Sequence, residues 1–202
     1  MRTARVEAFS DGVIAILITV MVLELHIPKS PSWEALGEDV PVLLAYLLSF
    51  VYLGIYWNNH HHMLAAVSRV SGGVLWANLH LLFWLSLVPF TTAWMSENGF
   101  ATIPTAVYGM VLLLAAIAYF VLQGTLLRAQ GPGSRLAAAV GRDLKGKLSP
   151  ALYCAGIGLS FVNQWLGIAV YVALAVMWFV PDRRVERELI SHHAEEREST
   201  RS

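Results

Sequence analysis

The chain has 202 residues, of which 56% are hydrophobic and only 14% are charged, and its mean hydropathy is +0.57. These values exceed what the surface of a soluble domain tolerates, and the formal net charge of zero argues against a basic nucleic-acid-binding protein. We therefore predict an all-α, multi-pass membrane protein, whose charges are informative through their placement between apolar blocks.

A helix that crosses ~30 Å of hydrocarbon needs about 20 residues, so apolar blocks of that length are candidate membrane spans. This search gives six candidate spans, at about residues 6–27, 40–67, 73–95, 104–127, 148–162 and 165–180, of which the last two come from one longer block. The first block ends at Pro28, which cannot continue a helix, and no small-residue cleavage site follows it. We interpret it as a retained span rather than a signal peptide. The third contains Pro89, which membrane helices tolerate.

The last apolar block, from Leu148 to Val180, is too long for one span, because 33 helical residues would reach about 50 Å. Asn163, Gln164 and Gly167 supply a polar and flexible centre, so we predict two short spans joined by a tight hairpin.

The preceding basic linker is broken by Gly131-Pro132-Gly133 and has a short apolar segment at residues 136–140. That segment is a candidate interfacial helix.

Six spans place the N-terminus, the basic linker and the C-terminal arginines on the same side of the membrane. All of the 14 Lys and Arg residues except Lys29 then lie on that side. The positive-inside rule therefore predicts cytoplasmic termini in a cell-membrane protein. Residues 1–181 form the membrane domain in this interpretation, and residues 182–202 form a charged cytoplasmic tail.

The first span has two different faces. On a helical wheel, a narrow aliphatic stripe with Thr19 at its border comprises Phe9, Val13, Ile16, Val20, Leu23 and Ile27. Asp11 points roughly the opposite way. Because an aspartate inside a membrane is costly when it faces lipid, we expect the Asp11 side to be buried in protein. The stripe then faces either lipid or a symmetry axis.

Polar side chains gather at the cytoplasmic ends of the first three spans. Arg5 and Asp11 are about 120° apart on the first helix, so each needs a partner elsewhere. The second span offers Trp57 and His60-His61-His62, and the third offers Trp76, Asn78 and His80. We predict a polar cluster of Ser10, Asp11, His60 and Asn78, capped by Trp76, which satisfies groups that hydrocarbon cannot.

Other chemistry has less support. Three adjacent histidines on a helix point in three directions, which disfavours a shared metal site. The sequence shows no nucleophile with a matched base, so it gives little support to an enzyme. Cys154 lies in an apolar segment and is interpreted as a packing residue. Two hypotheses from these residues stay open: a proton-coupled carrier that uses Asp11 with His60–His62 as a relay, and a non-conducting membrane scaffold.

Arg5 followed by Phe9-Ser10-Asp11 at the start of a first membrane helix resembles the signature of the transmembrane-protein-175 family of lysosomal and prokaryotic potassium channels. The match extends to Trp57 with His60, Trp76 with Asn78, and Pro89-Phe90-Thr91, and covers nearly the whole chain.

The resemblance implies a homotetrameric potassium channel without a carbonyl-lined filter loop, in which four first helices line the pore. It places apolar constriction rings on Ile16, Val20 and Leu23 and a hydroxyl layer on Thr19, residues that the wheel had put on or beside one stripe. Arg5, Phe9, Ser10 and Asp11 belong to the supporting network, and Glu24 lies at the outer mouth. Monovalent cations, membrane lipid and further copies of the chain are the expected partners, and no cofactor is implied beyond permeant K⁺.

Overall fold

The computed structural model describes residues 3–67, 70–131, 133–140 and 144–179, and these ranges contain helices but no strand. The helices are α1 (Thr3–Leu23), α2 (Trp33–Glu38), α3 (Val40–Ala65), α4 (Gly72–Ser86), α5 (Val88–Glu97), α6 (Thr102–Gln130), α7 (Arg135–Val140), α8 (Leu144–Ser160) and α9 (Gln164–Phe179). The predicted all-α class is confirmed. Four segments within the described ranges are long and apolar enough to cross a membrane, namely α1, α3, the α4–α5 pair and α6.

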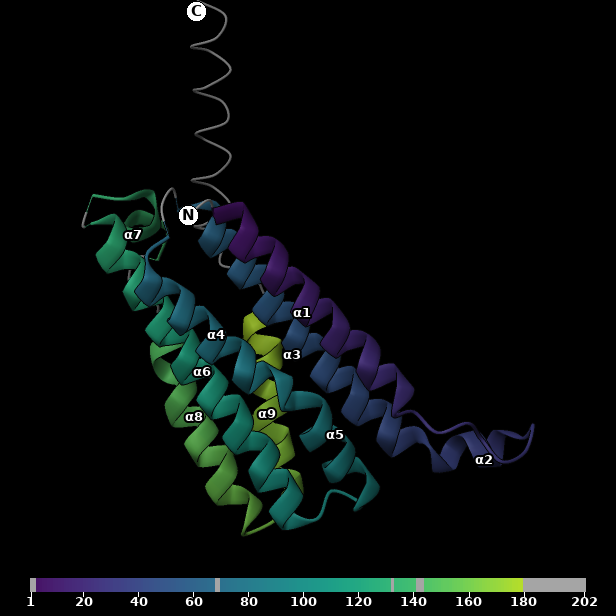
Figure 1. Ribbon diagram of the computed structural model, residues 1–202. Helices are drawn as coiled ribbons and strands as arrows, with labels where there is room; N and C mark the ends of the chain where they lie inside the picture. Colours follow the sequence, from purple (N-terminus) through teal and green to yellow (C-terminus); the bar gives the residue numbers. More distant parts are fainter. Residues whose placement is uncertain (1–2, 68–69, 132, 141–143, 180–202) are drawn as a thin grey trace, which may run out of the picture.

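The helices form a bundle in which α1 lies beside α3, α4 and α5, while α6, α8 and α9 pack together on the other side (Figure 1). The start of α1 and the short helix α7 lie at one end of the bundle. The short helix α2 extends beyond the opposite end. The predicted tail at residues 182–202 lies outside the described residues.

Helix α1 covers a different range from the predicted one, because it begins at Thr3 and ends at Leu23 rather than near Ile27. At its start, the Thr3 hydroxyl donates a hydrogen bond to the carbonyl of Val67. Pro28 disfavours the helical conformation of the residue before it, so the helix has ended before Ile27 is reached. The backbone N–H of Leu25 closes a last turn onto Val22.

The predicted third span is interrupted at Leu87, which separates α4 from α5. Pro89 has no N–H to donate to the carbonyl one turn earlier, and this explains the interruption. Two threonines satisfy nearby carbonyls: the hydroxyl of Thr91 donates to Leu87 and that of Thr92 donates to Val88. The threonine hydroxyls thus provide additional hydrogen bonds to carbonyls at the start of α5, beside the interruption.

Two helices replace the long apolar block, with the chain turning between Ser160 and Gln164. Asn163 caps the second of them, because its Oδ1 accepts a hydrogen bond from the backbone N–H of Trp165 at 2.8 Å. Gly167 lies directly against Ser160, where a side chain would not fit. The polar residues of this turn thus allow α8 and α9 to pack closely as a hairpin.

Tyr171 of α9 organises the packing of α6, α8 and α9. Its side chain is fully buried and lies against Gly109 of α6 and Gly156 of α8, each of which would clash with it if it carried a Cβ. The Tyr171 carbonyl also accepts a hydrogen bond from the Tyr52 hydroxyl of α3 at 2.6 Å. These contacts attach α3, which lies beside α1, to the rest of the bundle.

We expect Gly109→Ala to destabilise the protein by about 1–3 kcal/mol, since Tyr171 is enclosed on its other side by Gly156 and cannot swing away. Thermal melting of the purified protein in detergent measures the loss. Gly124→Ala is the matched control on the same helix, because nothing lies within 4 Å of its added Cβ. Equal melting temperatures for the two variants would contradict this packing.

Candidate functional site

The predicted stripe lies on the uncovered face of α1. The exposed fractions of Ile16, Val20 and Leu23 are 61%, 37% and 82%, whereas Ile14, Leu17 and Met21 are buried against the bundle. Thr19 is also exposed, and its hydroxyl donates to the carbonyl of Ile16 at 2.9 Å. In a single copy this stripe therefore has no protein partner. Both predicted alternatives, a stripe that faces lipid and a stripe that faces a symmetry axis, agree with this exposure.

A buried hydrogen-bond chain joins α1 to its two neighbours. The Ser10 hydroxyl donates to the Val6 carbonyl at 2.8 Å and accepts from Asn78 Nδ2 at 2.9 Å. The Asn78 Oδ1 lies 2.7 Å from His60 Nε2, and because an amide oxygen only accepts, the histidine is the donor. Ser10 and His60 are fully buried and Asn78 nearly so. The structure thus brings together three of the four residues of the expected polar cluster.

Asp11 lies outside this chain. Its Oδ1 accepts a hydrogen bond from Trp57 Nε1 of α3 at 3.0 Å. Adjacent helical residues differ in direction by about 100°, so Ser10 faces the bundle core while Asp11 lies at its edge. The predicted contact of Asp11 with His60 and Asn78 is therefore wrong, and no direct hydrogen bond links Asp11 to His60 in the relay that the carrier hypothesis needs.

One turn before Asp11, a second contact joins the same two helices. Glu7 Oε1 lies 2.8 Å from His61 Nδ1, and His61 stacks on Trp57. On α1, Glu7 and Asp11 are four residues apart, and on α3 their partners His61 and Trp57 are also four residues apart. Residues at this spacing are neighbours on one face of a helix. That spacing was the available signal for a Glu7–His61 contact, which the sequence interpretation missed.

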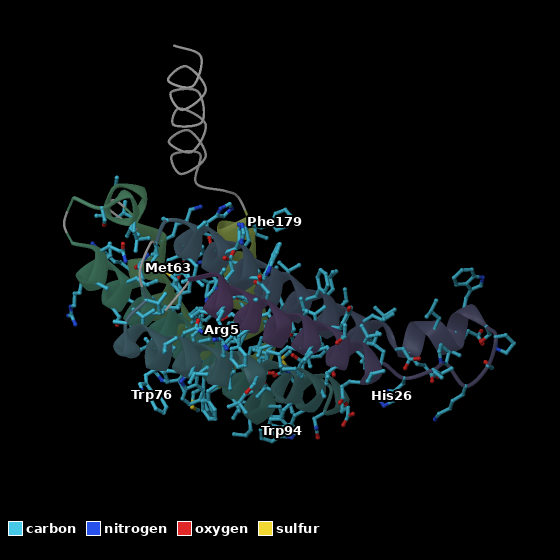
Figure 2. The ribbon with its side chains drawn as sticks, turned by 45° about the horizontal axis from the view of Figure 1, so that its top comes forward. Arg5, His26, Met63, Trp76, Trp94 and Phe179 are labelled. Atoms are coloured by element: carbon cyan, nitrogen blue, oxygen red, sulfur yellow. The ribbon has the colours of Figure 1, made fainter. Side chains whose placement is uncertain are left out.

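The remaining predicted residues are more exposed. Trp76 is 76% exposed and does not cap the cluster, because it lies on the outer face of α4; Figure 2 shows Trp76 and Trp94 along the same edge of the molecule. Arg5 and Phe9 are exposed on α1, and Arg5 has no ion pair within the described residues. Glu24 and Glu97 line a small cavity at the far ends of α1 and α5.

The three adjacent histidines of α3 have separate surroundings. His60 is buried and its Nδ1 has no hydrogen-bond partner in the described part of the chain, His61 contacts Glu7, and His62 is exposed. Among the described residues, no group of three His, Cys, Asp or Glu side chains is placed to hold a metal ion. The histidines therefore act individually rather than as one ligand set.

The chain is similar in sequence and fold to known proteins. A family model described as "Endosomal/lysosomal potassium channel TMEM175" matches residues 5–89. A potassium channel of Chryseobacterium sp. is 48% identical over 94% of this chain and 98% of its own length, and one of Streptomyces collinus is 34% identical over 87% and 91%. The crystal structure of a lysosomal potassium-selective channel TMEM175 homolog from Chamaesiphon minutus superposes with a TM-score of 0.75 at 32% identity, covering 88% of this chain and 96% of that one.

Ser10→Ala should destabilise the protein by about 1–3 kcal/mol, because it leaves the buried Asn78 Nδ2 without an acceptor. Thermal melting in detergent is again the measurement. Ser86→Ala is the control: this exposed serine bonds only to its own helix, at the Phe83 carbonyl, and its loss should change stability by less than about 0.5 kcal/mol. A Ser10 variant as stable as the Ser86 variant would show that the chain does not hold α1.

Proposed function

The chain belongs to the TMEM175 family of potassium channels, and we propose that four copies conduct K⁺ through a central pore lined by the exposed stripe of α1. It is a membrane channel and not an enzyme. The observation that carries the pore assignment is the contrast on α1 between a face held by buried contacts and an apolar face that one copy leaves uncovered. One helix cannot enclose a path, so a pore on this face requires several copies around an axis.

Within such a pore, Ile16, Val20 and Leu23 form apolar layers about 6 Å and about 4.5 Å apart along the helix. Apolar constrictions of this kind control conduction by dewetting and by forcing an ion to shed water. Thr19 adds a polar layer between them: its hydroxyl proton is engaged by the Ile16 carbonyl, so its oxygen lone pairs remain available to a cation. Glu24, directly after the end of α1, supplies negative charge at the outer mouth, which concentrates cations.

The proposed topology has six membrane helices per copy, formed by α1, α3, α4–α5, α6, α8 and α9, with residues 1–181 as the channel domain. Both termini are cytoplasmic in this arrangement. Two observations support it: α1 begins at the end of the bundle where α7 lies, and the basic residues Arg128, Lys145 and Lys147 border α7 in the sequence.

Ile16→Asn should change the K⁺ to Na⁺ permeability ratio or increase leak, because it replaces an apolar ring by four hydrophilic side chains. Currents across planar bilayers that contain the purified protein measure both quantities. Ile117→Asn, which makes the same change at an exposed isoleucine of α6, is the matched control and should leave permeation unchanged. If Ile16→Asn conducts like the unmodified protein, or if both variants change alike, the pore does not follow this stripe.

Asp11→Ala should lower the yield of tetramer, since it removes the acceptor that ties α1 to Trp57 and thereby aims the stripe. The oligomer mass of the purified protein and K⁺ and Na⁺ flux into vesicles are measured on the same preparation. Trp57→Phe, which removes the indole N–H donor but keeps an aromatic ring, should act in the same direction. A fully assembled and normally conducting Asp11→Ala protein would exclude this role.

A further inference from the structure

A cavity separate from the proposed ion path lies between α3 and the group formed by α6, α8 and α9. Helix α3 packs closely against α1, α5 and α9, whereas it meets α6 and α8 through long side chains: the ring of Tyr56 contacts Tyr119 of α6, and the ring of Tyr52 contacts Tyr153 of α8. The resulting space has an empty volume of about 500 Å³, counting the part that is open to the surroundings. Its largely aromatic walls, with a few polar groups among them, are typical of sites that bind small amphipathic ligands.

The polarity of the walls changes with depth. Asn59 and Gln123 lie about 10 Å from the helix ends at which α3 and α6 finish, and Ser149 is similarly close to the start of α8. Tyr52 and Ala116 lie about 20 Å from the same ends of α3 and α6. A ligand therefore meets amide and hydroxyl groups near the helix ends and mainly carbon surface further in.

Two further features describe the ligand. Tyr56 lines the cavity, so its hydroxyl adds a polar group to a mainly apolar wall. Gly146 lines the cavity at its outer end and is flanked in the chain by Lys145 and Lys147. The entrance therefore has positive charge close to it, at the level where Trp178 donates to Ser149.

We propose that this cavity binds an anionic membrane phospholipid, with one acyl chain at the deep apolar end and the phosphate at the level of Lys145 and Lys147. The lipid comes from the leaflet at the end of the bundle where α1 begins. Because one wall of the cavity is α3, whose other side holds α1 through Trp57 and His61, an inserted chain supports the helix that positions the stripe. The site itself does not depend on the chain's being a channel.

The test uses the full chain in phosphatidylcholine vesicles with a trace of phosphatidylglycerol that carries a diazirine on one acyl chain. After illumination, mass spectrometry locates the label. We expect several-fold more label in peptides containing residues 52–59, 116–123 and 146–153 than in the peptide with the exposed Phe83 and Phe90. Excess unlabelled phosphatidylglycerol should compete for the cavity peptides. Label spread evenly over the exposed helix faces would overturn the proposal.

Two variants fill the cavity to different extents. Ala116→Trp and the milder Ala116→Leu should both reduce labelling of the cavity peptides, and Ala155→Trp, at an exposed position of α8 outside the cavity, should not. Each is compared only if it elutes in size-exclusion chromatography like the unmodified protein. If the Ala116→Leu protein is folded and labels normally, no acyl chain reaches the deep end.

The charge of the head group is tested separately. Lys147→Gln should reduce labelling by phosphatidylglycerol about fivefold, toward that of a diazirine-bearing phosphatidylcholine, because a lysine beside an anionic head group attracts it. Equal labelling by the two lipids in the unmodified protein would overturn the anionic assignment. K⁺ flux is measured in the same vesicles. Because labelling does not require conduction, a failure of the lipid site and a failure of the proposed channel function are distinguished.

Discussion

The hydrogen bonds from His60 through Asn78 to Ser10 are the interaction on which the rest of the structure depends. In hydrocarbon, no water can pair with a polar side chain, so the three residues satisfy one another and must remain at hydrogen-bond distance. Each comes from a different helix, and their mutual contact fixes α1 against α3 and α4. The exposed face of α1 is consequently the face that these bonds do not use.

The second half of the bundle is held by close packing instead. Without a hydrophobic driving force between helices in a membrane, association depends on close approach and on satisfied polar groups. Gly109 and Gly156 admit the ring of Tyr171, and the Tyr171 carbonyl binds Tyr52 of α3. Polar fixation near the start of α1 and glycine-mediated packing around α9 therefore meet on α3, which transmits the position of one group of helices to the other.

The sequence was sufficient for the fold class, for the approximate positions of the long apolar helices and for the exposed face of α1, because hydropathy and helical periodicity are local properties. It also identified Ser10, His60 and Asn78 as polar groups at similar depth. It did not predict the short helix α2 or the interruption between α4 and α5. The partner of Asp11 depended on a rotation of about 100° between adjacent residues, which depth alone does not resolve. The same limit applies to Trp76, whose position in the sequence gives its depth but not the face of α4 on which it lies.

The contacts of α1 also differ along its length. Within the described residues, its side-chain hydrogen bonds and ion contact to other parts of the chain come from Thr3, Glu7, Ser10 and Asp11, all in its first half. From Gly12 to Leu23 the helix is held by apolar contacts of Ile14, Leu17 and Met21, and Met21 borders a small cavity. Apolar contacts are non-directional and tolerate small displacements better than a hydrogen bond of fixed geometry. In the proposed pore, a change of pore width at Val20 and Leu23 therefore costs less free energy than a rotation of the start of α1. The first half of the helix orients the ion path, and the second half sets its diameter.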